Sequence, residues 1–209
     1  MKCMFRLAVF LILVLDLAGT TWAQVSAPVI DRVEEDWELT IAEPDVAGAG
    51  PQITTTMSPA GDNAICFVAF NLNYRDSPFQ AGGLQTQAWA GRSTPEDSKS
   101  QGVAQCSTSG ETISWTQVLA LSGGQVTYDI KNGDSTTWGQ FGQGGNLKVA
   151  FAAPLTSLAA YSPDVSVAKS GVGWQSNRVT SMTLVRIRYY AGSTLVRTDS
   201  TPRPVNLSR

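Results

Sequence analysis

The sequence predicts an all-β protein, a single antiparallel β-sandwich, and three observations lead to this prediction. Apolar and polar residues alternate with a period of two in most segments after residue 35, which is the pattern of half-buried strands. Glycine, proline, serine and asparagine residues separate these segments and favour turns. No apolar pattern of helical period continues over several turns. A jelly-roll or lectin-like topology is favoured, and an immunoglobulin-like topology comes second.

Nine segments are predicted as strands. They are residues 36–42, 51–59, 63–74, 83–90, 111–121, 123–133, 146–154, 178–190 and 194–198. The sequence SGG at 122–124 predicts a tight turn between two of them, and NG at 132–133 predicts a hairpin-type turn. A short helix fits only within residues 154–164.

The longest alternating segment, residues 178–190, also predicts which side chains share a face. Strict alternation places Met182 and Leu184 on the face of Arg186 and Arg188. The opposite face then carries an apolar set, consisting of Val179, Val185, Ile187 and Tyr189.

The first 23 residues have the order of a secretory signal peptide. Lys2 and Arg6 precede the apolar run LAVFLILVLDL at 7–17, and small residues follow up to Ala23. An uncleaved membrane anchor is the alternative, but the apolar run is shorter than the ~20 residues that a spanning helix needs. We therefore expect a secreted protein, extracellular, periplasmic or at the cell surface, whose mature chain has no membrane span.

The rest of the chain is long enough for one domain with its own core. Residues 24–34 are predicted as a lead-in arm, 35–198 as the β-sandwich and 199–209 as a flexible tail. The formal net charge of the whole chain is only −2, and its basic residues are scattered. This balance predicts no nucleic-acid partner.

Cysteine usage predicts one disulfide. Cys3 lies within the signal peptide, so Cys66 and Cys106 are left as a pair in an exported protein. The alternative is two unrelated buried thiols.

The sequence contains no histidine. Catalysis that relies on imidazole as base, and zinc sites built on histidine, are therefore excluded. Glycoside hydrolysis by two carboxylates stays open. Asp36 and Glu38 lie two apart on one predicted strand, whereas Asp129 is a single acid on another. The sequence therefore shows no clear pair of carboxylates that would face each other across a cleft, and an enzyme is the less favoured class.

Two glycine-rich stretches carry the candidate ligand-binding residues. Pyranose rings stack on exposed aromatic side chains, and amides hydrogen-bond their hydroxyl groups. The candidates from residues 133–147 and 170–179 are Trp138, Phe141, Gln143, Trp174, Gln175 and Asn177. The alternative is that the aromatic side chains fold back as plugs, because tryptophan is usually buried.

Two charged segments have a functional and a structural interpretation. The acidic run 31–38 could bind Ca²⁺, but it matches no calcium loop and is better explained as a solvated lead-in. Arg186 and Arg188 could grip a uronic acid, or could pair with acids on the neighbouring strand, which is the commoner arrangement.

The sequence thus favours a secreted, non-catalytic β-sandwich without a cofactor. Its expected ligand is a carbohydrate or another extracellular polymer, bound through loop aromatics. A structural or surface-interaction protein without a small-ligand pocket is the alternative, and a carboxylate-based glycosidase or lyase is the third candidate.

Overall fold

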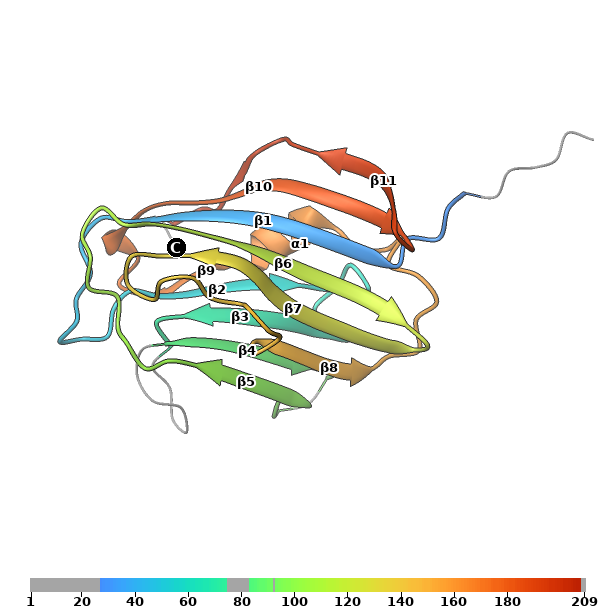
Figure 1. Ribbon diagram of the computed structural model, residues 1–209, viewed down its shortest axis with the longest axis horizontal. Helices are drawn as coiled ribbons and strands as arrows, with labels where there is room; N and C mark the ends of the chain where they lie inside the picture. Colours follow the sequence, from blue (N-terminus) through green and yellow to red (C-terminus); the bar gives the residue numbers. More distant parts are fainter. Residues whose placement is uncertain (1–26, 75–82, 92, 208–209) are drawn as a thin grey trace, which may run out of the picture.

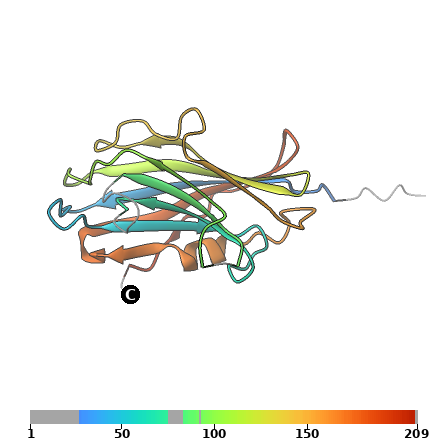
Figure 2. The same ribbon diagram turned by 90° about the horizontal axis from the view of Figure 1, so that it is seen from below.

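The computed structural model describes residues 27–74, 83–91 and 93–207, and two antiparallel sheets packed on each other form their core (Figures 1 and 2). One sheet has the order β11 (Thr194–Asp199), β10 (Val179–Ala191), β1 (Arg32–Ile41), β6 (Thr112–Ser122), β7 (Gln125–Asp134) and β8 (Lys148–Ala152), with β12 (Arg203–Pro204) paired to β10. The other has the order β5 (Asp97–Gln101), β4 (Leu84–Trp89), β3 (Phe67–Leu72), β2 (Gln52–Met57) and β9 (Gly171–Trp174). The predicted all-β sandwich is therefore confirmed. The predicted signal peptide lies outside the described residues.

Each predicted strand segment overlaps one strand of the structure, and three strands were missed. The missed strands are β5, β9 and β12. Their sequences are DSKSQ, GVGW and RP, which lack the alternation of a half-buried strand. One helix, α1 (Pro163–Lys169), starts at the end of the segment in which a short helix was expected, and η1 (Ser176–Arg178) is a single turn. Among the described residues, no helix has the length and apolar character needed to cross a membrane.

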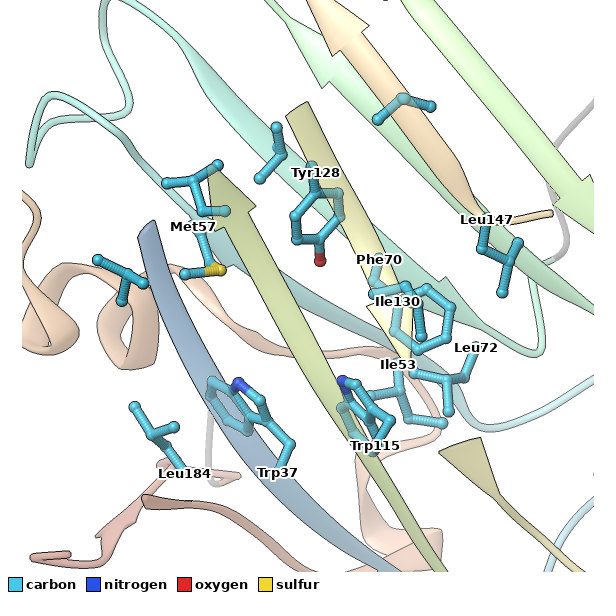
Figure 3. Packing of buried hydrophobic residues seen from close by; sticks show 14 of the residues in the cluster. Trp37, Ile53, Met57, Phe70, Leu72, Trp115, Tyr128, Ile130, Leu147 and Leu184 are labelled. Atoms are coloured by element: carbon cyan, nitrogen blue, oxygen red, sulfur yellow. The ribbon is translucent and has the colours of Figure 1, made fainter. Parts of the chain in front are cut away.

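The core lies between the sheets and is built on aromatic side chains from both. Trp37 of β1 stacks on Trp115 of β6 with ring centroids 6.3 Å apart, and Phe70 of β3 meets Trp115 edge-on (Figure 3). Tyr128 of β7 is also fully buried. These rings close the space between the layers and remove a large apolar area from water.

A bulge in β10 changes the predicted faces of that strand. Asp36 pairs with Arg186 and Trp37 pairs with Leu184, so Val185 is an extra residue without a partner on β1. The extra residue shifts the inward and outward alternation of the side chains by one position. Leu184 therefore faces the core together with Ile187 and Tyr189, and the prediction that Met182 and Leu184 share a face with the arginines is wrong.

Of the two glycine turns predicted in the β6–β7 region, the structure contains one. At 122–124, Gly123 and Gly124 form a two-residue turn with φ of 57° and 76°, as a type I′ hairpin requires. At 132–133, the strand continues to Asp134, and the pairing with β6 shifts register between Lys131 and Asp134. The expected hairpin turn there is therefore a bulge inside β7.

Phe141 fills the space over Gly133. The two residues exchange backbone hydrogen bonds, each with an N···O distance of 3.0 Å, and Phe141 is fully buried against Phe70. A Cβ atom on Gly133 would lie 2.2 Å from the Phe141 ring. The aromatic side chain of this glycine-rich stretch is therefore a plug, and it packs where the bare backbone leaves room.

The predicted disulfide between Cys66 and Cys106 is absent, and both are buried free thiols. Cys66 directly precedes β3, whereas the amide of Cys106 donates to Asn73 Oδ1 beyond the other end of that strand. At ~3.3 Å per residue the two ends are about 20 Å apart, and a disulfide requires Cα atoms within about 7 Å. The spacing along β3 therefore keeps the sulfur atoms apart.

Both ends of the described chain pack on the sandwich. β1 already begins at Arg32, within the segment that we expected as a lead-in arm. In the segment expected as a tail, β12 pairs with β10, and the amide of Val205 donates to the Met182 carbonyl. Val205 is buried there.

The fit of Phe141 over Gly133 predicts that Gly133→Ala destabilises the fold by about 1–3 kcal/mol, because a methyl group forced into a packed core displaces its neighbours. Gly171→Ala is the matched control, since a Cβ there meets nothing within 4 Å. Urea unfolding of both variants measures the effect. Equal unfolding midpoints for the two variants would contradict the packing described here.

Candidate functional site

The two glycine-rich stretches place their candidate residues at different edges of the five-stranded sheet. Trp138 is half buried, and its indole Nε1 donates to the Ala104 carbonyl, in the chain that follows β5, at 2.8 Å. Trp174 is 45% exposed and ends β9, the strand at the other edge of the sheet. The structure therefore does not bring the two tryptophans together into one aromatic cleft.

The amides of these stretches divide in the same way. Gln143 and Asn177 are exposed on their separate segments. Gln175 has a left-handed backbone with φ of 54°, and its Nε2 donates to Asp45 Oδ2 at 2.9 Å. This side chain tethers the β1–β2 connection and has a structural role.

A groove of about 730 Å³ lies on the outer face of the seven-stranded sheet. It crosses β10, β1, β6 and β7, which lie side by side in Figure 1. Its polar lining includes the side chains of Asp36, Glu38, Thr116, Asn132, Arg186 and Arg188. Polar groups from four neighbouring strands converge in this groove, which makes it the candidate site.

Asp36 is the centre of this groove. Its Oδ2 accepts hydrogen bonds from Arg186 Nε and Arg188 Nη1, both at 2.7 Å. Its Oδ1 accepts from Arg188 Nη2 at 3.0 Å and from Thr116 Oγ1 at 2.9 Å. Both carboxylate oxygens therefore have two donors, and residues of two other strands, β10 and β6, hold this side chain in place.

Neighbouring residues extend the cluster in both directions. On one side, Asn132 Nδ2 donates to Thr116 Oγ1 at 3.3 Å. On the other side, Arg188 Nε donates to Glu34 Oε2 at 2.9 Å. Chains of charge-assisted hydrogen bonds of this kind hold their members in fixed positions.

The cluster keeps its charges over a wide pH range. Burial by itself would raise the pKa of Asp36, but the hydrogen bonds from Arg188, Arg186 and Thr116 lower that pKa below its ordinary value. Burial opposes the charge of Arg188, and its contacts with Asp36 and Glu34 outweigh burial and raise its pKa. Asp36 and Arg188 therefore stay ionised together.

The sequence contained part of this site. Arg186 and Arg188 were considered as a grip for a uronic acid, or as partners of acids on the neighbouring strand. The second interpretation describes the observed contacts. Thr116 and Asn132 were missed. The available signal was a polar residue on the outward side of an otherwise apolar strand, but nothing in the chain tells which strands become neighbours.

The arrangement favours binding over carboxylate catalysis. Asp36 and Glu38 both project to the outer face of β1, as the glycosidase interpretation requires. A glycosidase nucleophile must attack the sugar with an oxygen lone pair. The lone pairs of Asp36 already accept four hydrogen bonds, two of them on each oxygen. The two guanidinium groups also stabilise the ionised carboxylate and so reduce its nucleophilicity.

The acidic run 31–38 is divided between the two faces of β1. Glu34, Asp36 and Glu38 point outward, whereas Glu35 is buried in the core. Within residues 27–74, 83–91 and 93–207, no three acidic or cysteine side chains gather closely enough to hold a metal ion. Alternation along the strand separates the carboxylates that the sequence places side by side.

Glu35 is a fully buried carboxyl group. Trp37 Nε1 donates to its Oε2 at 2.8 Å, and the Tyr161 hydroxyl donates to its Oε1. Burial raises its pKa from the ordinary 4.5 to about 7, although the hydrogen bonds from Tyr161 and Trp37 act in the opposite direction. Because the group is sealed from solvent, it belongs to the core and not to the groove.

Comparison with known proteins does not place the chain in a family. No family model matches the chain, and no curated protein matches it. A solved structure of Scytalido-glutamic peptidase with a peptide-based transition-state analog resembles it at a TM-score of 0.32 and 11% sequence identity. The match covers 83% of this chain and 82% of that one. A likeness this distant supports no conclusion about activity.

The raised pKa of Glu35 predicts how stability depends on pH. Below pH 4.5 the carboxyl is protonated in the folded and the unfolded chain. As the pH rises to about 7, the unfolded chain ionises while the folded chain keeps its proton, so the folded state loses roughly 3 kcal/mol in this window. Glu35→Gln removes this loss, because the amide carries no charge at any pH.

The measurement is the free energy of unfolding against pH for the wild type, Glu35→Gln and Glu38→Gln. The free energy of unfolding of the Glu35→Gln variant should increase relative to that of the wild type as the pH rises from about 4.5 to about 7. Glu38→Gln, on the exposed side of the same strand, should follow the wild type. A constant difference between Glu35→Gln and the wild type across this window would show that Glu35 does not titrate as described.

Proposed function

We propose that this protein is an exported, non-catalytic β-sandwich that binds a carbohydrate polymer in the groove of its seven-stranded sheet. The observation that carries the proposal is an open groove of about 730 Å³ whose hydrogen-bonding side chains are fixed by one another. Export rests on the order of residues 1–23 in the sequence.

The shape of the groove favours a segment of a long chain. It crosses four strands, and because neighbouring strands lie ~4.8 Å apart, this corresponds to about 14 Å. A volume of this size, open to solvent, can hold several units of an extended polymer while the rest of the chain runs on.

The chemistry of the groove favours hydroxyl groups. Carboxylate and hydroxyl oxygens accept hydrogen bonds, and the guanidinium, amide and hydroxyl groups donate them. Sugar hydroxyls do both, so they can meet either kind of group. Because Asp36, Arg188 and Thr116 already hold each other in place, little side-chain freedom is lost on binding.

The proposal moves the binding site from the loop aromatics to the sheet face. Phe141 is a plug and Trp138 is anchored by its indole NH, so they offer little surface for stacking. Trp174 is the exposed aromatic of the original set, but it lies in the other sheet. The proposal therefore rests on hydrogen bonding in the groove.

Arg186→Ala tests the proposal. The Arg186 side chain is 52% exposed and contacts Asp36 through Nε, so its loss leaves Asp36 held by Arg188 and Thr116 and the fold intact. We expect binding to become about tenfold weaker, because one charge-assisted hydrogen bond to the ligand is lost. Affinity electrophoresis in gels that contain soluble glucan, mannan, xylan or galactan measures it.

Arg197→Ala is the matched control. Arg197 is exposed on β11 of the same sheet and lies over the Tyr189 ring, so the variant loses the same charge outside the groove. It should bind as the wild type does. If no polysaccharide retards the wild type, or if both variants lose retardation equally, the groove is not the carbohydrate site.

A further inference from the structure

We propose that the groove selects an uncharged, hydroxyl-rich polysaccharide and discriminates against chains that carry carboxylate or ammonium groups. This inference rests on the proposed function and specifies its ligand class. It starts from the charges that line the groove, which are those of Asp36, Glu38, Arg186 and Arg188. The charges of two acids and two arginines cancel, so the lining as a whole has no net attraction for a positively or a negatively charged ligand.

A uronic acid would have to compete with a carboxylate that the protein already supplies. Arg188 contacts Asp36 through both terminal nitrogens and Glu34 through Nε, and its side chain is only 18% exposed. Arg186 gives its Nε to the same Asp36. A ligand carboxylate can form a bidentate pair with Arg188 only by displacing Asp36, which would leave that half-buried charge with Arg186 and Thr116 as its remaining donors.

Glu38 adds a repulsive element. It lies on the exposed side of β1, two residues from Asp36, and lines the groove. Its cross-strand neighbours are Ser114 and Thr183, which carry no charge. Among the described residues no arginine or lysine forms an ion pair with it. A polyanion laid along the groove would meet this carboxylate within the Debye length.

An ammonium-bearing chain meets the opposite obstacle. The negative charge of Asp36 is covered by two guanidinium groups, and Arg186 extends into the groove beside it. Apart from Glu38, the groups that remain for a ligand are neutral or belong to already paired ions, and Ser114, Thr116 and Asn132 provide hydroxyl and amide groups along the groove. Specificity here comes from exclusion as much as from attraction.

The test compares polymers of one size and different charge on the full chain. Wild-type protein is titrated with a neutral glucan, a neutral mannan, polygalacturonate and chitosan, at about 50 and about 500 mM NaCl. We expect a neutral polymer to bind at least about tenfold more tightly than either charged one. Its affinity should change less than about twofold between the two salt concentrations, because no net charge is neutralised on binding.

Glu38→Gln isolates the charge balance. The variant leaves the Asp36 cluster intact and gives the lining a net charge of +1, so it should gain affinity for polygalacturonate and acquire salt dependence. Glu43→Gln is the matched control, because Glu43 is exposed on the β1–β2 connection, outside the groove. This variant should retain the selectivity of the wild type.

The outcomes separate the two proposals. Preferential, salt-sensitive binding of polygalacturonate that is lost in Arg186→Ala, or of chitosan that is lost in Glu38→Gln, would overturn the neutral-ligand inference and leave carbohydrate binding in the groove standing. Failure of every polymer to bind the wild type would overturn the proposed function, and the ligand class with it. Neutral-polymer binding with unchanged selectivity in Glu38→Gln would show that charge balance does not set the preference.

Discussion

The stacking of Trp37 on Trp115 between the two sheets is the contact on which the rest of the molecule depends. The two rings are cross-strand partners on β1 and β6, and their burial fixes the register of these central strands. Asp36 and Thr116 are then partners on the outer face. Because side chains alternate, a slip by one residue would move Trp37 to the solvent and Asp36 into the core. The apolar core thereby determines where the polar groove forms.

The groove combines ion pairing with an open surface. Four hydrogen bonds to Asp36 come from three neighbouring residues on two other strands, so the recognition groups are ordered before a ligand arrives. The same contacts reduce the reactivity of the carboxylate and balance its charge. The proposed function uses these ordered groups to hold a polar, uncharged chain and not to cleave it.

Sequence reasoning located most strands but not the details that pack them. The missed strands β5, β9 and β12 follow the edges of sheets that longer, alternating strands had already defined, and their own residues carry no pattern of burial. The bulge at Val185 was invisible for the same reason, because period-two alternation counts residues and cannot show where one lies outside the ladder. The predicted disulfide between Cys66 and Cys106 was wrong because an even number of cysteines does not show how far apart they lie in the fold.

The sequence by itself determined the all-β class and the position of most strands, because local alternation contains that information. Only the tertiary structure decided that β1 lies between β10 and β6, that the bulge turns Arg186 and Arg188 toward Asp36, and that Phe141 is buried over Gly133. These outcomes depend on contacts between residues far apart in the chain. Such contacts are set by how the two sheets close on one core, and no local pattern records them.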